Sequence, residues 1–223
     1  MDYTNTWKYH QTDNRDHLKN AARRLRFVTK EINKISDIKK TLDIGFGDGQ
    51  LLNLLAKKYD THGIDFVQEN IALARKATGL GDNIKFGNST SIPFEENSFD
   101  LVTATEILEH LSEEELKKSL NEISRVLVPG GYLVLTVPYK EKLSEKNTCC
   151  PNCGTTFHIW GHQQSFNDEN IPKKFGNGFT IVKIQRTIPM GESQNLFGWI
   201  ESIGRLVMKK YKGYLIILKS NKS

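Results

Sequence analysis

The chain has 223 residues, 38% of them hydrophobic and 26% charged, which favours one globular domain with a buried core and leaves too little length for two ordinary domains. No apolar run approaches the about 20 residues that cross a bilayer, and residues 1–10 lack the apolar stretch of a secretory signal, so we expect a cytoplasmic protein without a membrane span. The net charge of +5 leaves nucleic acid open as a partner, but without interleaved aromatic residues we favour a lysine-rich solvated surface.

The N-terminal part of the chain is predicted to be helical. Between residues 18 and 35, apolar side chains recur every three or four positions, as they do along one face of an amphipathic helix. Residues 1–40, including Trp7 and Tyr9, would then form a helical lid that excludes water from an active site. The alternative is an N-terminus that frays in solution.

Residues 41–138 alternate between short strands and helices. The predicted strands are residues 41–45, 62–65, 84–86, 99–105 and 132–137, and the predicted helices are residues 51–59, 67–78 and 113–127. Ser112, with Glu115 three residues later, has the spacing of a capping box at the start of the third helix. Because parallel neighbours need crossover connections, the alternation predicts a mostly parallel sheet with helices on both faces.

Residues 166–223 are expected to complete the same sheet, so that residues 1–223 form a single domain. The patterns predict a helix at 167–174, a strand at 179–185, an amphipathic helix at 196–206 and a last strand at 214–218. The apolar face of the helix at 196–206 would bury against the sheet or against a second subunit. Both a monomer and a homodimer are therefore open.

A glycine-rich turn, Gly45-Phe-Gly-Asp-Gly, joins the first predicted strand to the helix that follows it. Glycine is needed where the backbone takes a positive φ or closely approaches a ligand, although packing alone also selects glycine in such turns. Asp65 ends the second predicted strand, where a carboxylate can accept hydrogen bonds from both hydroxyls of a ribose. In an open parallel sheet, the turn and the carboxylate should face the same crevice.

Four segments in order resemble motifs of the class I S-adenosylmethionine-dependent methyltransferases, as found in methyltransferase type 11 and ubiquinone-biosynthesis methyltransferases. They are Leu42-Asp-Ile-Gly-Phe-Gly-Asp-Gly, Gly63-Ile-Asp, Ile92-Pro-Phe-Glu-Glu-Asn-Ser-Phe-Asp and Leu127-Val-Pro-Gly-Gly-Tyr-Leu. The resemblance covers residues 41–138, which would form the cofactor-binding core. It implies a Rossmann-like α/β fold: a seven-stranded, mostly parallel sheet with an antiparallel last strand and helices on both faces.

The resemblance also assigns residues to S-adenosylmethionine. Asp43 would brace the glycine turn and receive the methionine amino group, Gly45, Gly47 and Gly49 would line the methionine and ribose, and Asp65 would hold the ribose. Phe66 would pack against the adenine, and Ser89 would assist through its backbone. Many relatives carry an aspartate at the position of Asn88 that accepts a hydrogen bond from the adenine amino group, a role open to the amide oxygen as well.

A nicotinamide-dependent dehydrogenase is the main competitor for a glycine-rich turn of this kind. Gln50 stands where the third glycine of the dinucleotide-binding pattern would be, and Pro129-Gly-Gly is more similar to the methyltransferases. We therefore disfavour a dehydrogenase.

Candidates for a catalytic base follow the fourth predicted strand. Glu106, Glu109 and His110 cluster there, and histidine has the intrinsic pKa for proton transfer near neutrality. His110 could equally cap or pack beneath the sheet. Glu106 could contact the methionine part of the cofactor or take a proton. His162 is a further candidate, because some small-molecule methyltransferases of this family carry a histidine at a similar place.

A Cys–His segment at residues 145–165 forms an insertion after the fifth predicted strand. Cys150 and Cys153 have the C-x-x-C spacing of a zinc knuckle, and His158 and His162 could complete a tetrahedral site, with Cys149 as an alternative ligand. Such a zinc ion would be structural, since a small insertion has no core of its own. The alternative is a loop with free thiols, in which His162 would be a base or have neither role.

The sequence therefore predicts an S-adenosylmethionine-dependent methyltransferase that acts on a small-molecule acceptor, by preference on oxygen, and releases S-adenosylhomocysteine. Two alternatives stay open. The basic charge and the knuckle would suit a tRNA methyltransferase. A cofactor-binding partner subunit without catalytic activity would retain the same cofactor motifs.

Overall fold

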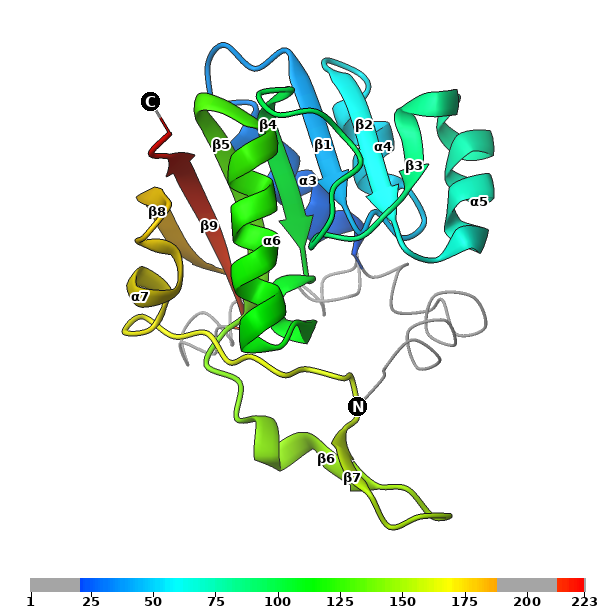
Figure 1. Cartoon of the computed structure of the whole chain (residues 1–223), viewed down its shortest axis with the longest axis vertical. Coiled ribbons are helices and arrows are strands. Elements are labelled where there is room, and N and C mark those ends of the chain that lie inside the picture. The colour runs from blue at the N-terminus through cyan, green and yellow to red at the C-terminus, as the bar shows by residue number, and fades with distance from the viewer. Residues whose placement is uncertain (1–20, 188–211, 223) are drawn as a thin grey trace, which may run out of the picture.

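A seven-stranded sheet in the order β3-β2-β1-β4-β5-β9-β8 forms the centre of the computed structural model, which describes residues 21–187 and 212–222 (Figure 1). The strands are β1 (Lys40–Ile44), β2 (Asp60–Asp65), β3 (Ile84–Phe86), β4 (Phe99–Thr105), β5 (Leu127–Pro138), β8 (Phe179–Thr187) and β9 (Gly213–Ser220). Strands β1 to β5 pair in parallel, whereas β9 is antiparallel to both of its neighbours, β5 and β8. The predicted Rossmann-like sheet with an antiparallel last strand is confirmed.

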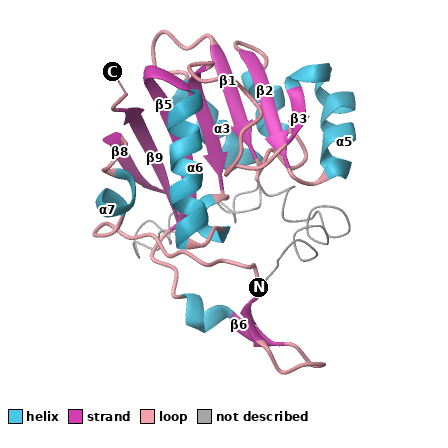
Figure 2. Cartoon of the chain, in the orientation of Figure 1, coloured by secondary structure: helices cyan, strands magenta, loops and turns pink. Residues whose placement is uncertain are grey.

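Helices cover both faces of this sheet, because β1 and most of β9 are buried along their length and must be shielded from water on both sides. The helices are α3 (Ala22–Ile32), α4 (Gln50–Leu55), α5 (Gln68–Thr78), α6 (Glu113–Val126) and α7 (Ile171–Phe175). Figure 2 shows α6 crossing one face, with α3 on the other. Among the described residues, none of these helices is long and apolar enough to cross a membrane.

Two hydrophobic layers hold the helices to the sheet. On one face, Leu116 and Ile123 of α6 belong to the same buried cluster as Val102 of β4. On the other face, Val28 of α3 packs in a cluster with Leu101, the neighbour of Val102 along β4. Successive side chains of a strand point to opposite faces, so β4 contributes to both layers.

Helix α6 starts as predicted and passes directly into a strand that is longer than predicted. Ser112 and Glu115 form the reciprocal hydrogen bonds of a capping box. Strand β5 begins at Leu127, which pairs with Phe99, and the pairing resumes at Tyr132 after a register shift. Gly130, with φ of 69°, lies in the intervening segment, which is therefore an irregularity within the strand and not a loop before it.

A two-stranded hairpin, β6 (Asn147–Cys149) and β7 (Thr156–His158), projects beyond the carboxyl ends of the parallel strands (Figure 1). It occupies the middle of the expected insertion at 145–165. The expected lid residues 1–20, including Trp7 and Tyr9, and the expected helix at 196–206 lie outside the described residues.

Candidate active site

The glycine turn between β1 and α4 has the backbone that only glycine adopts without strain. Gly45, Gly47 and Gly49 have φ angles of 67°, 57° and 78°. A Cβ atom at Gly45 would also lie 2.3 Å from Cδ1 of Ile107, closer than atoms approach in folded proteins. The turn therefore requires glycine for its conformation, and a larger residue at position 45 would also have to displace the tip of the Ile107 side chain.

Asp65, at the end of β2, is tied directly to this turn. Its carboxylate accepts the backbone N–H of Gly47 at 2.9 Å and that of Val67 at 2.8 Å. Burial raises the pKa of Asp65, and these two hydrogen bonds oppose that rise. Hydrogen bonds from the Asn70 side chain and the Phe66 backbone also oppose the rise, so a ribose hydroxyl would have to share this carboxylate with several donors.

Asp43 lies within β1, just before the turn, and is almost completely buried. Burial raises its pKa, a hydrogen bond from the Thr103 hydroxyl at 2.6 Å opposes the rise, and the nearby charge of Asp65 adds to it, so that the pKa is about 7. Near neutral pH this carboxyl can therefore be neutral or ionised. A cationic group bound beside it would favour the ionised form.

The residues expected around adenine differ in how free they are to contact a ligand. Phe66 is 36% exposed and follows Asp65 directly, so its ring is available to a ligand. The side-chain oxygen of Asn88 already accepts hydrogen bonds from the N–H and the hydroxyl of Thr90, at 3.0 and 2.8 Å. The hydroxyl of Ser89 is buried against that of Ser119, 2.8 Å away, which leaves only the backbone of Ser89 for a ligand. An adenine contact through Asn88 stays a prediction that would require one of the Thr90 bonds to break.

Glu106 opens the segment after β4 in a left-handed conformation, with φ of 56°. A non-glycine residue pays a conformational cost there, and such residues concentrate at functional sites. Its N–H donates to the carbonyl of Thr136 at 2.9 Å, and its carboxylate lies 3.8 Å from a guanidinium nitrogen of Arg24 in α3.

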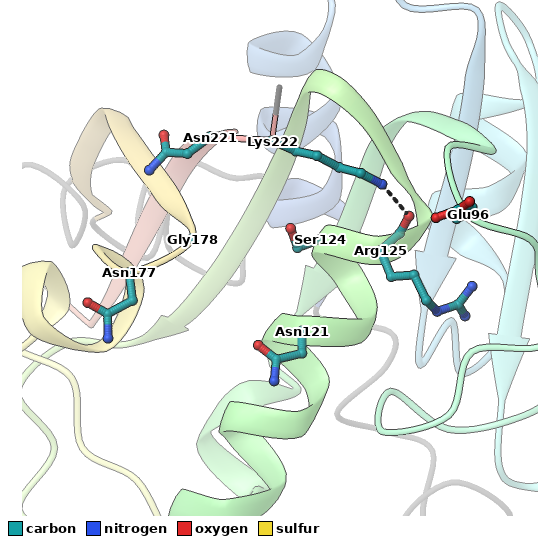
Figure 3. A pocket seen from close by; sticks show the side chains of 8 residues that line it. All are labelled: Glu96, Asn121, Ser124, Arg125, Asn177, Gly178, Asn221 and Lys222. Carbon is teal, nitrogen blue, oxygen red and sulfur yellow. Dashed lines mark hydrogen bonds between the residues drawn. The ribbon is translucent and has the colours of Figure 1, made fainter.

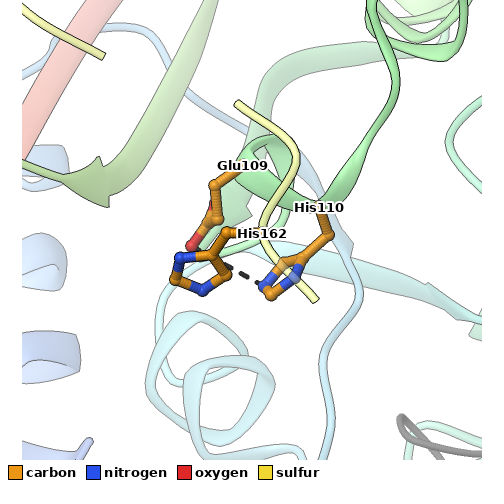
Figure 4. Close-up of side chains that lie close together, drawn as sticks. All are labelled: Glu109, His110 and His162. Carbon is orange, nitrogen blue, oxygen red and sulfur yellow. Dashed lines mark ion pairs between the residues drawn. The ribbon is translucent and has the colours of Figure 1, made fainter. Parts of the chain in front are cut away.

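Glu109 and His110 form a short 3-10 helix, Leu108–His110, against which a distant loop docks. The N–H groups of Gln163 and Gln164 donate to the carbonyl of Glu109 at 2.7 and 2.9 Å, and the Gln163 amide donates to the carbonyl of His110 at 2.7 Å. These bonds bring His162 to His110, with the ring centres 4.5 Å apart (Figure 4). The two predicted catalytic histidines thus share one site.

The charges at this site are unusual. Glu109 is fully buried, and neither of its carboxylate oxygens has a hydrogen-bond partner among the described residues. Burial raises the pKa of Glu109 well above its usual range, and the charge of Glu106 adds to the rise. Burial also lowers the pKa of His110 well below its usual range, so His110 is neutral at physiological pH.

Glu141, which the sequence analysis missed, connects His162 to the hairpin. Its carboxylate is hydrogen-bonded to Nδ1 of His162 and lies 2.8 Å from Nζ of Lys146. Burial alone would raise the pKa of Glu141, but the bonds to His162 and Lys146 outweigh it and lower the pKa to about 2. The available signal was its position in the loop after β5, at the carboxyl edge of the sheet where ligand-binding residues gather.

The cysteines lie away from the histidines that were expected to share a zinc ion with them. Among the described residues, the groups of three metal-ligating side chains are Glu109, His110 and His162, and Glu141, His158 and His162, and neither contains a cysteine. Cys149 ends β6, and Cys150 and Cys153 follow in the hairpin turn. The geometry therefore gives no support to a zinc ion shared by Cys150, Cys153, His158 and His162, with or without Cys149, and that zinc site stays a prediction.

A surface hollow lies at the opposite end of α6 from these groups (Figure 3). It is lined by Glu96, Asn121, Ser124, Arg125, Asn177, Gly178, Asn221 and Lys222. Nζ of Lys222 donates to the carbonyl of Arg125 at 3.1 Å across it. Lys219, just before Asn221 and Lys222 of the lining, pairs with Tyr132 in the first half of β5, so the hollow lies at the amino edge of the parallel strands, away from the glycine turn.

Comparisons with known proteins agree with the fold and the turn. Residues 42–135 match the methyltransferase domain family. Over 104 residues, 44% of this chain and 35% of the relative, it is 35% identical to norajmaline N-methyltransferase from Rauvolfia serpentina. Over 101 residues, 43% of this chain and 41% of the relative, it is 34% identical to demethylmenaquinone methyltransferase from Staphylococcus aureus. The match thus spans less than half the length of these relatives.

The fold as a whole is similar to solved methyltransferase structures. A putative sarcosine dimethylglycine methyltransferase from Galdieria sulphuraria superposes over 100% of both chains with a TM-score of 0.66 at 16% identity, which shows the fold alone. The matched residues 42–135 contain the glycine turn, Asp65 and the segment that carries Glu106 to His110. Residues 42–135 therefore form a methyltransferase domain, similar in sequence to two named methyltransferases.

Proposed function

We propose that the protein transfers the methyl group of S-adenosylmethionine to an oxygen atom of a small-molecule acceptor. The observation that carries this proposal is the hydrogen bond between Asp65 and Gly47, which joins the two cofactor motifs at the carboxyl edge of the sheet. Glu106, His110 and His162 lie beyond the same edge, where an acceptor would meet the methyl group. The match of residues 42–135 to the methyltransferase domain family supports the cofactor, and the acceptor is our inference.

The cofactor would bind in an extended arrangement along this edge. Asp65 would accept the ribose hydroxyls, and the turn from Gly45 to Gly49 would approach the ribose and the methionine. Asp43 would balance the methionine amino group, a role that its pKa of about 7 permits because the bound cation favours its ionised form. Phe66 would cover the adenine.

Transfer itself requires alignment more than chemical activation, since the sulfonium already makes the methyl group electrophilic. The acceptor oxygen forms a bond to the methyl carbon while the carbon–sulfur bond breaks, its electron pair stays on sulfur, and S-adenosylhomocysteine leaves. The hydroxyl proton has to go to a base. His110, which is neutral because burial lowers its pKa, can accept it, and the ring of His162 beside it is a second candidate acceptor.

The relatives leave the acceptor open. One is named for N-methylation and the other for a menaquinone precursor, and each is matched over less than half of its length. His110, His162, Glu109 and Glu141 lie together near the proposed transfer point. We favour a hydroxyl because an oxygen nucleophile needs a proton acceptor more than a neutral amine does.

Methyl transfer from isotopically labelled S-adenosylmethionine to a panel of phenols, catechols, amines and tRNA tests this proposal. We expect labelled product with a hydroxyl compound and stoichiometric S-adenosylhomocysteine. Transfer only to tRNA would support the RNA methyltransferase alternative. Tight S-adenosylhomocysteine binding without turnover on any acceptor, together with a stable complex with another protein, would support the inactive partner subunit.

A further inference from the structure

Three side chains near the proposed transfer point converge on one small volume. Glu109, His110 and His162 each offer a ligand atom, and these atoms all lie within 4.8 Å of one another. Glu109 and His110 come from the short helix after β4, whereas His162 comes from the loop after the hairpin (Figure 4). The loop is held there by the backbone bonds from Gln163 and Gln164 to Glu109, so the three side chains meet on a fixed framework.

Glu109 is the anionic group of this cluster. It is fully buried, and no described donor reaches either of its carboxylate oxygens. A buried carboxylate has to be neutralised by a proton or compensated by a cation. The two nearby imidazoles can each supply a nitrogen lone pair when they are neutral. A metal ion would use both lone pairs, whereas a proton on Glu109 would use neither.

His162 is oriented as a metal ligand would be. Its Nδ1 is hydrogen-bonded to Glu141, which leaves the other ring nitrogen for a ligand. Glu141 is itself fixed by Lys146, whose Nζ lies 2.8 Å away. A carboxylate behind a ligating histidine sets the tautomer and the direction of the ring in many metal sites.

The neighbouring group of Glu141, His158 and His162 is less suited to a metal. Nδ1 of His158 accepts the backbone N–H groups of Trp160 and His162, both at 3.2 Å, so the proton of a neutral His158 is on Nε2. That Nε2 lies 3.7 Å from a Glu141 oxygen and has no hydrogen-bond partner among the described residues. His158 has no free lone pair on its ring for a cation, and it instead holds the turn that places His162.

We propose that Glu109, His110 and His162 bind one divalent first-row transition-metal ion, with Glu141 orienting His162. Two imidazoles and one carboxylate are a donor set that such ions prefer, and three protein ligands leave coordination positions open. In the proposed function, an acceptor hydroxyl at an open position would lose its proton more readily; with His110 and His162 acting as ligands, that proton would go to Glu106 or to water. This catalytic use rests on the proposed function, whereas binding of the ion does not.

Cobalt(II) titration of the full chain, freed of metal with a chelator, tests the proposal without any acceptor or cofactor. Visible d–d absorption reports binding, and a near-ultraviolet thiolate-to-cobalt band reports cysteine ligands. We expect one ion per chain by native mass spectrometry and d–d absorption without the thiolate band. Absence of binding, or a thiolate band that disappears with Cys150→Ser/Cys153→Ser, would overturn the proposal.

Variants then identify the ligands. Glu109→Gln keeps the shape of the side chain, and His162→Asn removes a ligand at a less buried position. Circular dichroism shows whether each variant folds, and either variant is informative if the other does not fold. We expect each to weaken cobalt binding by about tenfold or more, whereas the exposed control Glu114→Gln and the double cysteine variant should bind as the wild type does. Unchanged binding by a folded Glu109→Gln and His162→Asn would contradict the assignment. Because no methyl transfer is measured, failure here is distinct from failure of the proposed function.

Discussion

The carboxylate of Asp65 accepts the N–H of Gly47 over 2.9 Å, so the end of β2 holds the turn that follows β1. The two residues are 18 positions apart in the chain. A molecule that binds the Asp65 carboxylate would therefore lie beside the glycine turn as well. The cofactor motifs of this protein act as one structural unit.

Gly45→Ala should damage that unit. The new Cβ would meet Cδ1 of Ile107 at 2.3 Å, and the residue would keep a φ of 67° that alanine adopts only with strain. We expect a loss of about 1–3 kcal/mol in the free energy of unfolding, measured in urea, and weaker binding of S-adenosylhomocysteine.

Gly154→Ala is the matched control for this substitution. Gly154 has a φ of 70°, but nothing lies within 4 Å of its Cβ position, and it is in the hairpin turn. It should carry only the conformational cost of about 1–2 kcal/mol and leave cofactor binding unchanged. Equal losses of affinity in both variants would show that the Ile107 contact is unimportant.

The raised pKa of Asp43 predicts a pH dependence of cofactor binding. With a folded pKa of about 7, Asp43 becomes ionised as the pH rises through neutrality, and the ionised form attracts the methionine amino group. The affinity for S-adenosylhomocysteine should therefore increase from about pH 6 to about pH 8. Asp43→Asn should remove the increase, and a persistent slope in this variant would place the titrating group elsewhere.

The same pKa predicts the opposite trend for stability without the cofactor. The ordinary pKa of an aspartate is 3.8, so the folded state binds the Asp43 proton more tightly than the unfolded chain does. Its contribution to stability is complete below the unfolded pKa and is lost as the pH rises through about 7. Urea unfolding at several pH values should show this loss in the wild type and not in Asp43→Asn.

Glu141→Gln tests the carboxylate behind His162. We expect cobalt affinity to fall by about 10- to 100-fold, because the amide orients the imidazole less strongly than the carboxylate does. Glu145→Gln, at an exposed glutamate paired with Lys142, is the control and should have no effect. Wild-type affinity in Glu141→Gln would show that His162 is positioned by its loop alone.

Binding to tRNA provides a separate check on the acceptor class. The net charge of +5 should support only non-specific association, with dissociation constants of about 1–100 μM at physiological salt and a steep decrease as salt increases. Filter binding across a salt series measures this. Nanomolar binding at physiological salt would contradict a small-molecule acceptor and favour the RNA methyltransferase.

Local patterns in the sequence predicted much of the fold. The capping box of Ser112 and Glu115 lies within one helical turn, and both residues adopt it. The glycines at 45, 47 and 49 all have positive φ, as the turn requires. By contrast, the early start of β5 depends on the pairing of Leu127 with Phe99, a contact between distant segments. Such tertiary pairing is not encoded in the pattern around Pro129.

The site was less predictable because its contacts join separate loops. Asn147 pairs with His158 and Cys149 with Thr156, so the hairpin register places His158 at the base and the cysteine turn at the other end. The short spacing in sequence therefore did not bring Cys150 and Cys153 together with His158. Glu141 has no motif of its own, and its contact with His162 depends on how the hairpin returns to the sheet.

Titration calorimetry of the full chain with S-adenosylhomocysteine tests most directly whether Asp65 and the glycine turn bind one cofactor. The account predicts one molecule bound per chain, an affinity about 10- to 100-fold weaker in Asp65→Ala, and wild-type affinity in Asp82→Ala, which changes an exposed aspartate. No binding by the wild type, or equal affinity in Asp65→Ala, would contradict it.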